Sequence, residues 1–130
     1  MARITDVRAL AVRVPLARPV QIATRQVEAR EYTLVWVETD DGTVGIGHAY
    51  AGTRGGRILR DIVLDIFRPV LLGADSTLLD QLWGALYQDA LLIRRRGAVL
   101  RSSSAVGLAL VDPPGLRPGL PLHRPLRATR

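Results

Sequence analysis

The sequence contains neither cysteine nor lysine among its 130 residues. Without cysteine, the chain cannot form disulfides, thiolate nucleophiles, iron–sulfur clusters or cysteine-based zinc sites. Without lysine, it has no Schiff-base lysine, no lysine general base and no P-loop lysine. No window reaches the roughly 18 uninterrupted apolar residues of a membrane-spanning helix. Arg3, Asp6 and Arg8 stand where a signal peptide would be apolar, so we expect a cytoplasmic protein.

Charge is unevenly distributed along the chain. The formal net charge is +6, and all 18 basic residues are arginine. Residues 1–90 hold 10 arginines and 11 acids, whereas residues 91–130 hold 8 arginines and a single acid, Asp112. The basic excess therefore lies in the C-terminal part, where a polyanion partner has to be considered. With 48% hydrophobic residues, the chain is long enough for one domain with its own core.

Three strands are predicted in the N-terminal part. Loose alternation of apolar residues over 4–14 predicts a first strand that ends at Pro15, and the stretch after Pro15 shows no sustained period and predicts a loop. Residues 32–39 are rich in β-branched and aromatic side chains, which are typical of a second strand. Asp41-Gly42 separates this run from a third strand over 43–50, and this dipeptide predicts a hairpin turn.

Helical periodicity begins after a glycine-rich turn. Apolar side chains recur every three or four residues over 58–71, which predicts an amphipathic helix that ends at Gly73. The same period over 79–91 predicts a second helix. Asp75 or Ser76 precedes it and is predicted to be its N-cap, because both side chains can accept a hydrogen bond from a free amide of the first turn.

A third helix is predicted from near Gly97 to Asp112. Pro113-Pro114 ends it, because proline lacks the amide donor and disfavours helical geometry in the residue before it. Three antiparallel strands followed by three helices define an α+β fold, with the helices packed on one face of a small sheet. We expect one domain over residues 1–112 and an irregular Pro/Gly/Arg-rich tail over 113–130.

Several short motifs share the order and spacing of a known family. They are Val14-Pro15-Leu16, Glu31-Tyr32-Thr33-Leu34-Val35, Asp41-Gly42-Thr43-Val44-Gly45 and Gly47-His48-Ala49-Tyr50. Together they resemble the N-terminal capping domain of the mandelate racemase/muconate lactonizing enzymes of the enolase superfamily, over about residues 3–112. No single motif is diagnostic, and the resemblance rests on their collinearity. It implies a three-stranded meander and a three-helix bundle that cap the mouth of a modified TIM barrel.

The resemblance also implies which loops contact a substrate. In the family, two loops of the capping domain close over a small carboxylate substrate, and they correspond here to residues 16–27 and 48–56. Such a lid excludes water and strengthens the electrostatic contacts beneath it. The side chains assigned in this way are Val20, Ile22, Val27, His48, Tyr50, Thr53 and Arg54. Two alternatives stay open: the three apolar side chains pack under their own loop, or His48 satisfies backbone groups at a strand end.

The chemistry implied by the resemblance is abstraction of a proton α to a carboxylate, as in a racemase, dehydratase or cycloisomerase. A divalent metal, usually Mg²⁺, stabilises the enediolate in that family. Its bases and metal ligands lie on the strands of the C-terminal barrel, a domain that is missing from this chain. The acids here are scattered, and turn chemistry explains the adjacent pair Asp40-Asp41 better than metal binding. We therefore expect no catalytic residue, metal ligand or cofactor in this chain, with Mg²⁺ implied for a full-length relative.

The resemblance weakens towards the C-terminus. The third helix of the family carries an Asp and a Trp where this chain has Gly107 and Val111. A glycine inside a helix costs about 1 kcal/mol relative to alanine, and loss of a core Trp costs roughly 3 to 5 kcal/mol, so both changes are expected to loosen the helix. Residues 119–124 return to the family's register and residues 125–130 leave it. The chain is interpreted as a truncated relative of a full-length enzyme, inactive alone.

Two other interpretations stay open at this level. The chain could be a small non-enzymatic binding module whose basic C-terminal region binds nucleic acid or another acidic partner, with steep salt dependence. No aromatic residue lies between Arg94 and Arg130, which counts against base stacking. A domain-interface salt bridge or a solvated charge run explains Arg94-Arg95-Arg96 better than a phosphate or nucleic-acid site. The other interpretation is a homo-oligomer that buries its barrel-facing apolar surface against a second copy.

Overall fold

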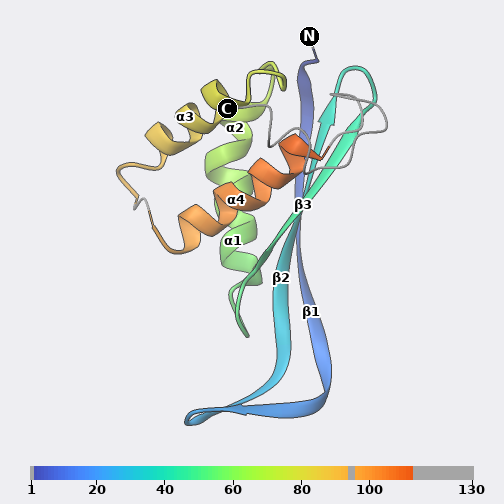
Figure 1. Ribbon diagram of the computed structural model, residues 1–130. Coiled ribbons are helices and arrows are strands. Elements are labelled where there is room, and N and C mark those ends of the chain that lie inside the picture. Colours follow the sequence, from blue (N-terminus) through green and yellow to red (C-terminus); the bar gives the residue numbers. More distant parts are fainter. Residues whose placement is uncertain (1, 94–95, 113–130) are drawn as a thin grey trace, which may run out of the picture.

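Three antiparallel strands form a meander in the order β1-β2-β3 (Figure 1). The computed structural model describes residues 2–93 and 96–112. The strands are β1 (Ile4–Ile22), β2 (Arg25–Thr39) and β3 (Val44–Tyr50). More buried and more exposed side chains alternate along β2 and β3. Successive side chains of a strand point to opposite faces of the sheet. Helices cover one of these faces. No other element among the described residues covers the opposite face, which we call the open face.

The predicted hairpin between β2 and β3 is confirmed. Gly42 has a φ of 80°, a left-handed conformation that glycine adopts without steric cost. The carboxylate of Asp41 accepts hydrogen bonds from the Thr39 hydroxyl and from the Thr43 amide. The Thr39 bond has the largest effect. Together these bonds lower the pKa of Asp41 below its usual value because they favour the charged form. Asp41 is therefore a turn residue, as its position beside glycine predicted.

The prediction that the first strand ends at Pro15 is wrong. β1 continues to Ile22, and its far half pairs with the beginning of β2 through contacts such as Val20 with Val27. Proline lacks a backbone N–H, but β1 is an edge strand of the sheet and can tolerate the loss of a donor. The register shifts between Pro15 and Val20, and this irregularity bends the hairpin. We call this two-stranded extension, residues 15–29, the arm.

A continuous helical rod follows β3. It consists of α1 (Gly56–Ile62), the π-helical segment η1 (Val63–Phe67) and α2 (Arg68–Leu71). The helix predicted over 58–71 is thus confirmed, with a wider turn in its middle. In a regular α-helix the Pro69 ring would meet the carbonyl group four residues earlier. The amide of Arg68 instead donates to the carbonyl of Val63, five residues back, and this wider turn accommodates the proline.

The second and third predicted helices are confirmed as α3 (Leu79–Asp89) and α4 (Ala98–Val111). Helix α4 crosses the sheet close to β3 (Figure 1). Their backbones approach so closely at Gly47 that a side chain there would overlap the carbonyl oxygen of Ala105. Strands followed by helices on one face of the sheet confirm the predicted α+β fold.

The predicted N-cap of α3 is wrong. Leu78 precedes the helix, and no side chain caps it. The carboxylate of Asp75 instead accepts hydrogen bonds from the amide and hydroxyl of Thr77, which lower the pKa of Asp75. The hydroxyl of Ser76 donates to the carbonyl of Ala2. Both side chains are therefore engaged elsewhere, because this segment pairs with the beginning of the chain before α3 starts.

The core fills the space between the sheet and the helices. Its fully buried large side chains include Ile4, Val7, Val35, Val37, Val63, Phe67, Leu71, Leu86 and Val106. Helix α4 runs unbroken through Gly107, where an added Cβ would lie 3.3 Å from Cζ3 of Trp83. The indole ring of α3 thus occupies the space beside this glycine. The expected loosening of α4 by Gly107 and Val111 stays a prediction.

Two sequence predictions fall outside the described residues. They are the irregular tail over 113–130 and the first two positions of the arginine run, 94–95. In the part of the chain that the structure describes, no helix is long and apolar enough to cross a membrane.

Candidate functional site

The arm bends at its far end towards the side of the sheet that the helices cover (Figure 1). Residues 51–55 join β3 to α1, and we call them the β3–α1 loop. The arm and this loop border a concave space of about 560 Å³ that is open to solvent. The side chains that line it are mostly polar: Arg13, Gln26, Glu28, Ala29, Thr53 and Arg54. We call this space the polar cavity.

Glu31 of β2 holds the β3–α1 loop in place. Its backbone amide donates to the carbonyl of Gly52, and its carbonyl accepts from the amide of Ala51, both at 2.8 Å. Its carboxylate Oε2 accepts from the amide of Gly56 at 2.8 Å, where the helical rod begins and free amides favour a negative charge. The buried hydroxyl of Thr33 donates to the carbonyl of Gly56 at 2.8 Å. The loop is thus bonded to β2 at both ends.

Arg13 of β1 and Arg101 of α4 also hold the β3–α1 loop in place. The Arg13 guanidinium lies 3.7 Å from the carboxylate of Glu31 and donates to the carbonyl of Thr53 at 3.2 Å. Arg101 of α4 donates to the carbonyl of Tyr50 at 3.0 Å, just before the loop. Strands β1 and β2 and helix α4 all bond to this short segment or its ends. The wall of the polar cavity that the loop provides is therefore preformed.

Replacing Glu31 by alanine is expected to loosen this wall. The amide of Gly56 loses its acceptor and Arg13 loses its ion-pair partner, so we expect a loss of about 1 to 3 kcal/mol of folding free energy. Hydrogen–deuterium exchange should become faster in peptides that cover residues 50–56. Glu28→Ala is the control, because Glu28 is an exposed acid of the same strand. Unchanged exchange in Glu31→Ala would contradict the assigned role.

The polar cavity combines cationic, anionic and neutral groups. Arg13 and Arg54 offer N–H donors to carboxylate or phosphate oxygens, while Gln26, Glu28 and Thr53 can exchange hydrogen bonds with hydroxyl groups. Over residues 2–93 and 96–112, no group of three or more His, Cys, Asp or Glu side chains could hold a metal ion. The arrangement is suited to binding a polar, acidic small molecule.

The structure brings two of the predicted site residues to the cavity, since Thr53 and Arg54 both line it. Val20 and Ile22 lie on the arm with 42% and 57% of their surface exposed. Val27 is buried and pairs with Val20 across the hairpin. Packing within the arm accounts for Val27, whereas Val20 and Ile22 remain available to a partner. A substrate contact for these three residues stays a prediction.

His48 and Tyr50 lie on the open face of the sheet. Gly47 approaches α4 and Ala49 packs against the core, so both face the helices. His48 and Tyr50 alternate with them along β3 and therefore point to the opposite face of the sheet. The Tyr50 ring lies 5.6 Å from the ring of Tyr32, centroid to centroid. Neither His48 nor Tyr50 is among the lining residues of the polar cavity. Their contact with a substrate likewise stays a prediction.

Three lining residues were missed by sequence reasoning: Arg13, Gln26 and Glu28. The strand was expected to end at Pro15, so the polar residues beyond it appeared to belong to an aperiodic loop. The antiparallel register places Arg13 opposite Glu31, and continuing it past Pro15 would have placed Gln26 near the arm's end, opposite Gln21. That register was the signal that could have found them.

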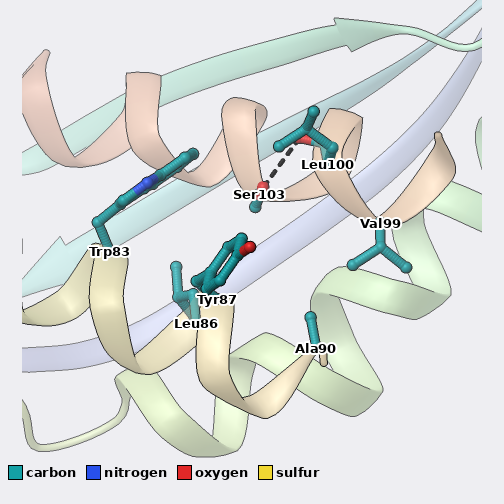
Figure 2. Close-up of a pocket in the computed structure, with 7 residues that line it drawn as sticks. All are labelled: Trp83, Leu86, Tyr87, Ala90, Val99, Leu100 and Ser103. Atoms are coloured by element: carbon teal, nitrogen blue, oxygen red, sulfur yellow. Dashed lines mark hydrogen bonds between the residues drawn. The ribbon is translucent and has the colours of Figure 1, made fainter. Parts of the chain in front are cut away.

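A second hollow lies between helices α3 and α4 (Figure 2) and encloses about 280 Å³, part of it open solvent. Its lining residues are Trp83, Leu86, Tyr87, Ala90, Val99, Leu100 and Ser103. The hydroxyl of Ser103 donates to the carbonyl of Leu100 in its own helix at 2.8 Å. Apolar side chains dominate the remaining wall. This hollow is a packing seam between two helices and is a weaker candidate than the polar cavity.

Sequence comparison gives consistent matches. Residues 4–126 match the family model described as mandelate racemase/muconate lactonizing enzyme, N-terminal domain. The chain is 32% identical over 94 residues to the 3,6-anhydro-alpha-L-galactonate cycloisomerase of Streptomyces coelicolor, which covers 72% of this chain and 26% of that enzyme. It is 34% identical over 105 residues to the L-rhamnonate dehydratase of Saccharopolyspora erythraea, with 78% and 26% covered.

Structural comparison agrees. The L-talarate/galactarate dehydratase from Salmonella typhimurium LT2, liganded with Mg and L-lyxarohydroxamate, superposes with a TM-score of 0.87 at 27% identity, covering 99% of this chain and 34% of that one. The chain spans 26% of the length of each of the two enzymes compared by sequence, the cycloisomerase and the rhamnonate dehydratase. Since the family model covers most of the sequence and the fold agrees, this chain belongs to the mandelate racemase/muconate lactonizing enzyme family and carries its N-terminal domain.

Proposed function

We propose that this chain is the lid of an active site in a C-terminal barrel domain, with the arm and the β3–α1 loop closing over the substrate. The polar cavity carries the proposal, because these two segments, distant in sequence, border one concave surface lined by charged groups. We assign residues 1–112 to the lid. The relatives support the missing barrel, since this chain spans 26% of their length.

We infer that the substrate is a small polyhydroxylated carboxylate. The matched enzymes are named for an anhydrogalactonate, for rhamnonate and for talarate or galactarate. A sugar acid of this kind presents a carboxylate, which suits Arg13 or Arg54, and several hydroxyl groups, which suit Gln26, Glu28 and Thr53. Val20 and Ile22 would then cover the non-reacting end of the substrate from the exposed side of the arm.

The reaction we propose for the whole enzyme is abstraction of a proton α to the carboxylate, as a dehydratase, cycloisomerase or racemase. Mg²⁺ is present in the Salmonella dehydratase structure, and in a full-length protein it would stabilise the enediolate charge. The described residues of this chain include no acidic cluster that fits the ion, so we assign its ligands and the base to the barrel. The lid orients the substrate and excludes water.

The alternative interpretation, a basic module that binds nucleic acid, gains no support from these comparisons. The family match runs to residue 126 and thus includes most of the arginine-rich C-terminal part. The basic residues of that part do not by themselves indicate a nucleic-acid partner.

The proposal predicts no turnover by the purified chain with Mg²⁺ and L-rhamnonate or galactarate. A chimera that joins residues 1–112 to the barrel of the Salmonella dehydratase should be active. Within it, Arg54→Ala should raise KM by about tenfold or more, since a charge-assisted hydrogen bond contributes about 1.5 to 3 kcal/mol. Arg57→Ala is the control, because Arg57 is an exposed arginine of α1.

Two results would overturn the proposal. One is Mg²⁺-dependent turnover by the chain alone in a clean preparation. The other is a folded, active chimera in which Arg54→Ala and Arg57→Ala have the same KM, because the cavity would then make no contact with the substrate. Circular dichroism establishes that each chimera is folded before kinetics are compared.

A further inference from the structure

The two arginines of the polar cavity differ in their partners within the domain. Arg13 donates to the carbonyl of Thr53 at 3.2 Å and lies 3.7 Å from the carboxylate of Glu31, so its charge is balanced. The guanidinium of Arg54 lines the same cavity and forms no hydrogen bond or ion pair with any other described residue. Of the two, Arg54 is therefore the cation whose N–H donors are available to a ligand.

Glu28 is an acid of the polar cavity in the same situation. Its carboxylate forms no hydrogen bond or ion pair within the part of the chain that the structure describes, and it does not pair with Arg54. A ligand that engages both side chains has to bring a carboxylate for Arg54 and a hydroxyl or ammonium donor for Glu28. The sugar acids of the proposed function carry the carboxylate and the hydroxyl groups.

The backbone around Arg54 is held before a ligand arrives. The amide of Gly55 donates to the carbonyl of Ala51 at 2.9 Å, and the carbonyl of Gly52 accepts from the amide of Glu31 at 2.8 Å. Gly52 has a φ of 71°, a conformation in which glycine lets the chain turn tightly. Binding therefore has to order the side chain of Arg54 but not the loop that carries it, which keeps the entropic cost low.

We propose that the polar cavity binds a sugar acid without the barrel, with the carboxylate on Arg54 and a hydroxyl group on Glu28. The choice of ligand rests on the proposed function, whereas binding by this chain alone goes beyond it. The planar guanidinium offers two parallel N–H donors that match the two oxygens of a carboxylate. Arg13 keeps its bonds to Glu31 and Thr53, so it supports the wall of the cavity and does not take the carboxylate.

The expected affinity is low. The cavity of about 560 Å³ has a size that is usual for small-molecule sites, but it is open to solvent and lacks any contact from a barrel. For a ligand as small as a sugar acid, we expect a dissociation constant on the order of 1 mM. Arg54 would then be the residue by which the lid selects acids over neutral sugars.

Heteronuclear NMR titration of the full chain with galactonate at constant ionic strength tests the proposal. Saturable shifts are expected for the amides of residues 51–56 and for the Nε–Hε group of Arg54. Galactitol has the hydroxyl groups without the carboxylate, and hexanoate has the carboxylate without the hydroxyl groups. Each should bind about tenfold more weakly than galactonate or worse, because each engages only one of the two free side chains.

Two substitutions of Arg54 separate charge from geometry. Arg54→Gln should raise the dissociation constant for galactonate by about tenfold or more. Arg54→Lys should raise it less, because lysine keeps the charge and loses the paired donors. Arg57→Gln is the matched control, since Arg57 is an exposed arginine of α1 that does not line the cavity. Circular dichroism establishes that each variant is folded, as expected for exposed positions.

Several outcomes would overturn the inference. Absence of saturable shifts with galactonate does so and leaves the proposed function standing, which fails separately through the kinetics of the chimera. Equal affinity for galactonate and galactitol or hexanoate, or equal affinity of Arg54→Gln and Arg57→Gln for galactonate, also contradicts it. Sulfate that binds as tightly as galactonate would indicate an adventitious ion only. Tighter binding of ε-aminocaproate would assign an ammonium ligand to Glu28 in place of a sugar acid.

Discussion

Replacing Gly47 by alanine is expected to destabilise the domain by about 3 kcal/mol or more, the upper part of the range for overpacked cores. The added Cβ would overlap the carbonyl oxygen of Ala105 and lie 2.7 Å from the amide nitrogen of Ala109. Both atoms belong to the backbone of α4, so they cannot rotate away as a flexible side chain would. The whole helix would have to move off β3, and the contacts of Val106 with the core would be lost.

Urea unfolding followed by circular dichroism measures this effect as a lower midpoint at constant slope. Gly84→Ala is the matched control. Gly84 lies exposed in α3 with no heavy atom within 4 Å of an added Cβ, and alanine there should stabilise the domain by about 0.5 to 1 kcal/mol. If Gly47→Ala unfolds at the same urea concentration as the parent, α4 does not approach β3 as closely as described.

Replacing Phe67 by alanine is expected to cost about 3 to 5 kcal/mol, the range for removing a buried aromatic side chain. Phe67 is fully buried at the end of η1 and belongs to the same core as residues of the sheet and of α4. Because the free energy of unfolding of a single domain is only about 5 to 15 kcal/mol, this one change removes a large part of the domain's stability. The midpoint of thermal unfolding should fall by about 10 °C or more.

Differential scanning calorimetry provides that midpoint, and Ile58→Ala is the control. Ile58 lies on the same helical rod but exposes 58% of its surface, so its truncation should change stability by roughly 0.5 kcal/mol or less. Equal effects of Phe67→Ala and Ile58→Ala would show that the rod does not present Phe67 to the core.

Much of the fold could be predicted because its signals are local. Asp41-Gly42 between two β-rich runs was sufficient for the hairpin, since only small polar residues and glycine suit that turn. The recurrence of apolar residues at three and four positions located the first two helices, and Pro113-Pro114 marked the end of the third. The predicted N-cap of α3 was wrong because it depended on a contact that is not local. Ser76 has the right chemistry for a cap, but its hydroxyl donates to the carbonyl of Ala2, far away in sequence.

The site was only partly predictable. Thr53 and Arg54 were found because the glycine-rich segment after β3 matches a family loop, and they do line the polar cavity. Gln26 and Glu28 were missed because Pro15 suggested the end of a strand. Arg13 was missed because its place at the cavity depends on contacts with Glu31 and Thr53. Whether a strand survives a proline depends on whether it lies at a sheet edge, and strand order is a property of the whole fold.

The sequence by itself determined the order of the elements, the hairpin turn, the helix spans and the family, because each depends on nearby residues or on their collinear spacing. Only the tertiary structure decided that the first strand continues into the arm, that the arm and the β3–α1 loop border one cavity, and that His48 and Tyr50 lie on the open face. These features depend on strand register and on contacts between distant segments, which local periodicity does not encode.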